Sequence, residues 1–263
     1  MIYPFVHKDC IQEVMSVLIE VCCGSLEDAL EAQAGGAQRV ELNSSLFFGG
    51  LTPSLGTIVA ARKHLRIPIM VMIRPRGGGF HYSSTELEVM ENDIEQAIAH
   101  GADGVVFGVL DERGALDEGA CRRLLVRAGG KQAVFHRAFD VMAGPEEGLE
   151  RIIALGFRRI LTTGRRANVE DGVETLRLII AQARGRIEIL PGGMVPRNAA
   201  RLTRETGCDQ IHIASYVRRT DPSARGNPEV YFGSALYPSE DSYEVIDRSF
   251  VAAVRGVTAV SPR

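Results

Sequence analysis

The chain has 263 residues, of which 45% are hydrophobic and 24% charged, so it holds enough apolar material for a sizeable core. Its formal net charge of −3 gives no basic excess for binding nucleic acid. No apolar run approaches the roughly 20 residues that span a bilayer, and Lys8, Asp9 and Glu13 interrupt the first stretch where a leader would be apolar. We expect a cytoplasmic protein that binds neither nucleic acid nor membranes.

Residues 1–16 match no pattern that follows and are interpreted as an N-terminal extension, a short helix or a remnant of cloning. Residues 17–23 then form an apolar strand. Ser25 is a good helix N-cap, with Asp28 three residues later, and predicts a helix that ends near Gly35. The fold therefore begins at about residue 17 and is predicted to be one domain, residues 17–263.

A recurring phrase organises the rest of the chain: a helix closed by glycine runs directly into a buried strand. It appears at residues 35–42, 101–106, 156–161 and 207–212. Further strands are predicted at residues 69–73, 132–136 and 187–190. About eight strands alternating with helices indicate a parallel sheet closed into an α/β TIM barrel. The open doubly wound alternative lacks its GxGxxG turn after the first strand, so no nucleotide cofactor is expected.

The tail departs from this alternation. Residues 216–243 are predicted to form a long segment without a barrel unit, and a final helix is expected near residues 244–260.

Polar side chains recur where barrel strands end, which is where barrel enzymes carry their functional groups. Side-chain alternation places Glu20 with Cys22 and Glu41 with Asn43 on one face of their strands, and burial of unpaired charges against the helices would be costly. We therefore expect these groups to meet inside the barrel mouth, together with the strand-end residues Arg74, His136 and His212.

Two interpretations of this polar set stay open. One is a buried ion-pair lattice in which Glu20 and Glu41 are balanced by Arg74 and Arg137. The other is a mixed arrangement in which one Glu–Arg pair is structural and the remaining groups bind a ligand.

Several strand ends suggest a small anionic ligand. Arginine binds carboxylates and phosphates through paired hydrogen bonds, and glycine-rich barrel loops often hold phosphate on backbone N–H groups. The candidates for anion binding are Arg74, Arg76, Arg137, Asp140 as an orienting carboxylate, Thr162 or Thr163, Gly192 and Gly193. Glycines in such loops also occur for conformational reasons alone.

Several strings together resemble the CutC family, which is named for copper homeostasis. They are residues 20–23 (EVCC), 39–42 (RVEL), 49–54 (GGLTPS), 73–78 (IRPRGG), 135–140 (FHRAFD), 161–164 (LTTG) and 191–193 (PGG). The resemblance covers about residues 17–212 and implies a TIM barrel, a cytoplasmic homo-oligomer (dimer or tetramer) and a role in copper handling through Cu(I) binding. The chain differs from the family pattern at Asn43, where members often have cysteine, at Ala214 and Ser215, and in the tail.

Copper binding would depend on Cys22 and Cys23, because Cu(I) favours thiolate and thioether ligands. Adjacent residues of a strand point to opposite faces and cannot share one ion, so Cys22 and Met72 are the pair expected in the lumen. Asn43 leaves a two-thiolate site hard to assemble within one subunit. The alternative is that both cysteines are buried small hydrophobic residues.

An enzyme is the second functional hypothesis. Glu20 or Glu41 would act as general base and His136 or His212 as acid or proton shuttle, while the arginines hold the anion. This set suits proton abstraction beside a carbonyl, as in an isomerase, epimerase or lyase. No lysine ends a strand, so a Schiff-base aldolase is not expected. A non-catalytic ligand-binding barrel is the third hypothesis.

Overall fold

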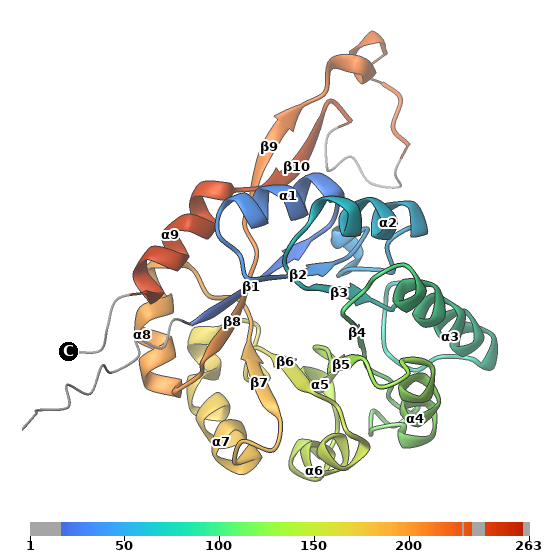
Figure 1. Cartoon of the computed structure of the whole chain (residues 1–263), viewed down its shortest axis with the longest axis vertical. Helices are drawn as coiled ribbons and strands as arrows, with labels where there is room; N and C mark the ends of the chain where they lie inside the picture. The colour runs from blue at the N-terminus through green and yellow to red at the C-terminus, as the bar shows by residue number, and fades with distance from the viewer. Residues whose placement is uncertain (1–16, 228, 233–239, 260–263) are drawn as a thin grey trace, which may run out of the picture.

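The computed structural model describes residues 17–227, 229–232 and 240–259, and its body is a barrel of parallel strands surrounded by helices (Figure 1). The predicted extension at residues 1–16 lies outside this range. The barrel strands are β1 (Leu18–Cys23), β2 (Arg39–Leu42), β3 (Ile69–Met72), β4 (Gly104–Phe107), β5 (Gln132–Phe135), β6 (Arg159–Thr162), β7 (Glu188–Pro191) and β8 (Gln210–Ile213).

The strands follow the order β7-β6-β5-β4-β3-β2-β1-β8, and every pairing between them is parallel. A bridge between Gly192 and His212 links β7 to β8 and closes the barrel. The predicted TIM barrel is therefore confirmed.

Nine α-helices lie within the described ranges: α1 (Leu26–Ala34), α2 (Leu55–His64), α3 (Ser84–Ala99), α4 (Glu118–Arg127), α5 (Ala138–Val141), α6 (Pro145–Leu155), α7 (Val173–Ala183), α8 (Pro196–Thr206) and α9 (Arg248–Thr258). Serine N-caps start several of them, including the predicted cap Ser25, whose side chain accepts a hydrogen bond from the Asp28 amide at 3.0 Å. No helix in the described part of the chain combines the length and apolar character needed to cross a membrane.

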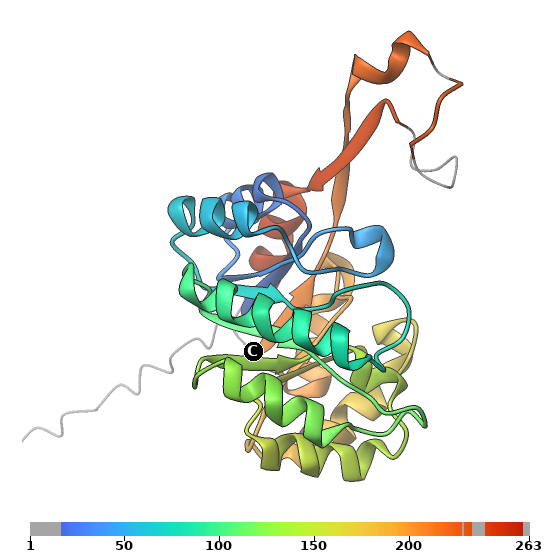
Figure 2. The same ribbon diagram turned by 90° about the vertical axis from the view of Figure 1, so that its right-hand side faces the viewer.

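The tail contains an antiparallel hairpin of β9 (Tyr216–Thr220) and β10 (Ser242–Ile246) that projects from the barrel (Figures 1 and 2). The predicted helix start near residue 244 is therefore wrong. Tyr243 and Val245 suit a strand and pair with Arg219 and Val217, and α9 begins only after Asp247, whose carboxylate caps it.

The lumen of the barrel is layered. The first residues of five strands, Arg39, Gln132, Arg159, Glu188 and Gln210, form a polar floor in which hydrogen bonds link Arg39 and Arg159 through the Gln210 side chain at 2.8 Å each. Above it lies an apolar layer of Met70, Met72, Val106, Val134, Leu161 and Leu190. Polar groups return at the strand C-termini, so a water-excluding belt separates the floor from the site.

Glu20 and Arg39 make the central ion pair of the floor, and both are almost fully buried. Replacement of Arg39 by methionine would leave the Glu20 carboxylate buried without its main partner, and we expect a loss of about 3–5 kcal/mol in the free energy of unfolding. Denaturant unfolding measures this loss. The control is Arg123→Met, which removes an exposed ion pair with Glu91 and should cost at most about 1 kcal/mol. Equal losses in the two variants would contradict the role given to the floor.

Candidate functional site

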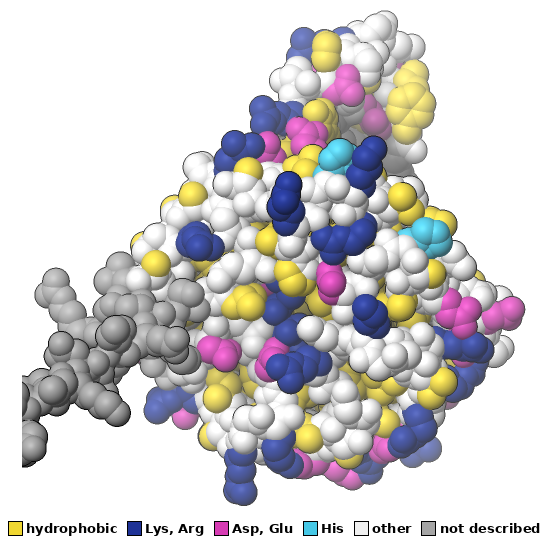
Figure 3. Space-filling view, viewed as in Figure 1, with side chains coloured by type: hydrophobic (Ala, Val, Ile, Leu, Met, Phe, Trp, Pro, Cys, Tyr) yellow, Lys and Arg dark blue, Asp and Glu magenta, His cyan; other side chains and the backbone are white. Residues whose placement is uncertain are grey.

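A cavity of about 610 Å³ opens at the C-terminal ends of the strands. Its polar lining comes from residues far apart in the sequence but brought together by the barrel: Cys22, Glu41, Asn43, Arg74, His136, Arg137, Asp140, Thr163 and His212. Met72, Phe80 and Leu161 add apolar surface. Of the groups predicted to meet at the barrel mouth, all but Glu20 line this cavity. On the face shown in Figure 3, acidic and basic side chains are interspersed without a single-sign patch.

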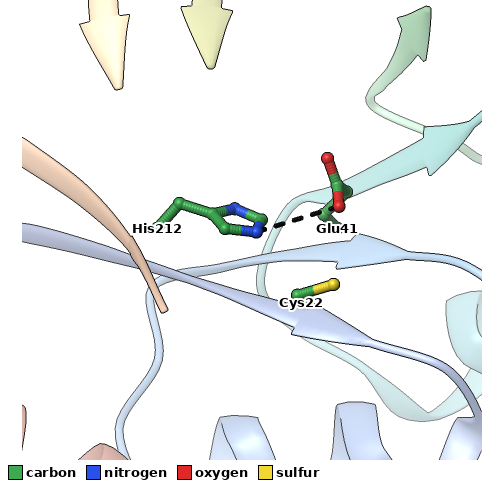
Figure 4. Close-up of side chains that lie close together, drawn as sticks. All are labelled: Cys22, Glu41 and His212. Carbon is green, nitrogen blue, oxygen red and sulfur yellow. Dashed lines mark ion pairs between the residues drawn. The ribbon is translucent and has the colours of Figure 1, made fainter. Parts of the chain in front are cut away.

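Three potential metal ligands gather on one wall of the cavity. One ligand atom each from Cys22, Glu41 and His212 lies within 4.8 Å of the others. Figure 4 shows the His212 imidazole pointing towards Glu41, with 3.9 Å between Nε2 and Oε2, and Cys22 beside them on β1. The register explains the grouping, because Cys22 pairs with Glu41 across β1 and β2, and β8 lies on the other side of β1.

Glu20 lies outside the cavity lining but fixes His212 from below. Its Oε1 accepts a hydrogen bond from His212 Nδ1 at 2.8 Å, while its Oε2 pairs with Arg39. This carboxylate holds the imidazole in one orientation and leaves Nε2 for the cluster, an arrangement common behind metal-bound histidines. Glu20 is therefore the structural member expected in the mixed interpretation, although its arginine partner is Arg39 and not Arg74 or Arg137.

Burial and neighbouring charges lower the pKa of Glu20 and raise the pKa values of the three cluster residues. Burial opposes ionisation of Glu20, but Arg39 and the His212 hydrogen bond outweigh it and lower its pKa to about 2. Burial raises the pKa of Glu41 and that of the Cys22 thiol. Burial also disfavours the charged form of His212, yet Glu41 and hydrogen bonds with Cys22 and Glu20 hold its pKa well above the usual value. The cluster thus shares protons that an incoming cation would displace.

The wall formed by β3 and β5 carries Arg74 and His136. Arg74 is 6% exposed and donates hydrogen bonds to the carbonyl oxygens of Phe48, Gly50 and Gly78 at 2.6–3.1 Å. The ring of Phe80 neighbours both side chains, with its centre 5.2 Å from the Arg74 guanidinium carbon and 4.8 Å from the His136 ring centre. Arg74 therefore contacts loop carbonyls, and the expected pairing with the glutamates is not formed.

Asp140 organises the third side of the mouth. Its carboxylate accepts hydrogen bonds from Arg137 Nε at 2.8 Å, from the Thr162 and Thr163 hydroxyls and from the Thr163 and Arg165 amides. The expected orientation of an arginine by Asp140 is thus present. Thr163 lines the cavity, whereas Thr162 lies behind it and supports Asp140.

A sequence model of the CutC family matches residues 17–217. The chain belongs to the CutC family. It is 48% identical over 231 residues to a family protein CutC of Treponema denticola, covering 88% of this chain and 94% of that protein. It is 41% identical over 245 residues to a protein named copper homeostasis protein cutC homolog in Homo sapiens, covering 93% and 89%. The solved structure of a putative copper homeostasis protein CutC from Streptococcus agalactiae superposes with a TM-score of 0.72 at 36% identity, covering 75% of this chain and 98% of that one.

Two of the expected site residues in this CutC-family barrel, Arg76 and Cys23, lie away from the cavity, and two glycines line it without free amides. Arg76 pairs with Glu86 of the α3 capping box and stacks over Tyr82, outside the cavity lining. Cys23 is fully buried in the core on the helix side of β1. Gly192 and Gly193 line the cavity, but their N–H groups already donate to the carbonyls of Thr162 and His212, so they offer no amide cradle for phosphate.

Residue alternation could have revealed one further member of the lumen. Arg39 lies two residues before Glu41 and shares its face, and the structure pairs it with Glu20. Asn43 lies at the mouth as expected, and its Nδ2 donates to Glu41 Oε2 at 3.0 Å and to Cys22 Sγ at 3.5 Å. Phe80 comes directly after Gly79 and lines the cavity, but no sequence pattern predicted that position.

The lowered pKa of Glu20 predicts a specific acid dependence of stability. Because its folded pKa of about 2 lies below the ordinary value of 4.5, its contribution is complete above pH 4.5 and is lost as the pH falls towards 2. The difference in unfolding free energy between the native chain and Glu20→Gln should therefore be constant between about pH 5 and pH 6 and shrink steadily below ~4.5. Chemical unfolding across this range measures it, and a difference independent of pH would show that Glu20 has no depressed pKa. Above about pH 6 the difference also reports His212, whose raised pKa depends partly on Glu20.

Proposed function

We propose that this protein acts in copper homeostasis by holding a copper ion at Cys22, Glu41 and His212. Two independent observations support this proposal. The first is the name of the human relative, which refers to copper homeostasis. The second is the convergence of a thiol, an imidazole and a carboxylate within 4.8 Å in a cavity of this chain, with the imidazole oriented by Glu20.

The donor set fits copper. Cys22 supplies the soft sulfur that Cu(I) favours, and imidazole suits copper in either oxidation state. The His212 Nδ1 is engaged by Glu20, so Nε2 is the nitrogen that would bind. Asn43, the residue after β2, stands beside the cluster where a second thiol would be needed, so the site has one thiolate. We propose Cys22 and His212 as its principal ligands with Glu41 as the third. The bound ion would be the protein's cargo, held in a partly buried site.

Replacement of Cys22 by serine should abolish stoichiometric copper uptake, because the only thiol of the cluster is lost. Anaerobic titration with Cu(I) against a chromogenic chelator measures uptake. The matched control is Cys23→Ala, which removes the adjacent thiol on the other face of β1 and should leave uptake unchanged. Unchanged uptake in Cys22→Ser, or its loss in Cys23→Ala alone, would overturn the assignment.

A second candidate function is proton transfer on a small anionic substrate, as in an isomerase, epimerase or lyase. The observation that favours it is the position of Glu41 and His136 around one cavity at the C-terminal end of a TIM barrel. Burial raises the pKa of Glu41, and a carboxylate with a raised pKa is a stronger base than an ordinary one.

Proton abstraction beside a carbonyl exchanges substrate hydrogen with solvent. If the second candidate is right, metal-free protein in D₂O should incorporate deuterium into fructose 6-phosphate or 2-ketogluconate, as followed by NMR. Glu41→Gln should suppress the exchange by removing the base. Absence of exchange in both compounds, or full exchange in Glu41→Gln, would count against Glu41 as a catalytic base.

A further inference from the structure

Arg74 is a buried cation without an anionic partner. Its Nη atoms are satisfied by three loop carbonyls, and the Tyr82 hydroxyl is a further neutral neighbour. Among the described residues, its Nε makes no hydrogen bond of normal geometry and no carboxylate lies within ion-pair distance. A buried charge without a counter-ion costs several kcal/mol, so the fold holds this guanidinium at the cavity at an energetic cost. An anion bound in the cavity would offset that cost.

His136 presents a second hydrogen-bond donor on the same wall. Its Nδ1 accepts the Ala138 amide at 3.2 Å, so the neutral ring carries its hydrogen on Nε2. Nε2 is buried and has no hydrogen-bond partner within the described part of the chain. Burial and then the nearby Arg74 lower the pKa of His136 to about 3, so the ring stays neutral and cannot itself repel or neutralise Arg74 at ordinary pH.

The side of the cavity at the end of β2 carries hydrogen-bond acceptors instead of donors. Glu41 Oε1 and Asn43 Oδ1 are both buried acceptors without a partner among the described residues. Figure 4 shows one carboxylate oxygen of Glu41 directed away from His212, so it lies outside the contact made by Oε2. The lining thus has unpartnered donors on the side of β3 and β5 and unpartnered acceptors on β2.

We propose that the cavity binds a small organic anion that carries hydroxyl groups. Its carboxylate or phosphate oxygens would accept from Arg74 and His136, and its hydroxyl groups would donate to Glu41 and Asn43. This proposal goes beyond both candidate functions, because it names the chemical class of ligand for the cavity and depends neither on copper nor on proton transfer. The volume of about 610 Å³ is in the range of sites that hold small metabolites.

The hydrogen-bond pattern makes the site selective in two ways. A neutral polyol would leave Arg74 without a counter-ion, and an unsubstituted fatty acid would leave Glu41 and Asn43 with unpartnered acceptors. Sites built around buried polar groups discriminate strongly against ligands that fail to pair them.

Calorimetric titration of metal-free protein tests this selectivity with four probes. Gluconate and glycerol 3-phosphate carry both an anion and hydroxyl groups, sorbitol lacks the anion, and hexanoate lacks the hydroxyl groups. We expect at least one of the first two to bind and neither of the last two. The two anions also distinguish a carboxylate site from a phosphate site. Failure of both anions to bind, or equal binding of sorbitol or hexanoate, would overturn the proposal.

Substitutions of His136 and Arg74 test whether the anion binds to these two side chains. His136→Phe keeps an aromatic ring against Phe80 but removes Nε2, and should weaken anion binding about tenfold or more, as expected for a lost hydrogen bond to a charged group. Arg74→Lys keeps the positive charge but loses the paired N–H donors of the guanidinium, so it should also weaken binding. The control is Arg123→Met on the outer surface, which should have no effect. Unfolding midpoints identify variants that have lost their fold. Unchanged affinity in a folded His136→Phe would overturn the proposal, whereas binding without deuterium exchange would support it and remove the enzymatic candidate.

Discussion

The two-sided pairing of the Glu20 carboxylate is the interaction on which both the barrel and its site depend. One oxygen meets Arg39 in the polar floor, and the other holds the His212 imidazole at the cavity. Removal of Glu20 would disturb the floor and free the histidine together. Stability and ligand geometry are therefore coupled through one residue that lines neither the surface nor the cavity.

The layers of the lumen strengthen the interactions of Glu20 with Arg39 and His212. The apolar belt between floor and mouth keeps water from the Glu20–Arg39 pair, and low polarity strengthens the electrostatic interactions that hold the cluster. The same environment makes unpartnered atoms expensive, yet Glu41, Arg74 and His136 each keep one. A ligand that paired with these atoms would offset the cost. Glu41 belongs to the proposed copper ligands and also faces the proposed anion in the same cavity, so the two proposals concern one site.

Strand alternation predicted much of this arrangement from the sequence. Glu20, Cys22, Glu41 and His212 were expected in the lumen because each shares a face with its neighbours two residues away, and the structure places them there. Loop geometry was not predictable in the same way. Arg74 and Arg76 are two residues apart, but loop carbonyls hold the first and Glu86 of α3 holds the second, and no local pattern specifies those partners. The amides of Gly192 and Gly193 likewise donate to backbone carbonyls of β6 and β8, which no local pattern predicts.

The central claim is that a single thiol, Cys22, acts with His212 and Glu41 as the ligand set of this barrel. X-ray absorption spectroscopy of the copper-loaded protein tests it directly, because sulfur and nitrogen or oxygen scatterers are resolved at different distances. We expect one sulfur together with an imidazole nitrogen and a light-atom ligand. A copper environment with two sulfurs, or with none, would contradict the account.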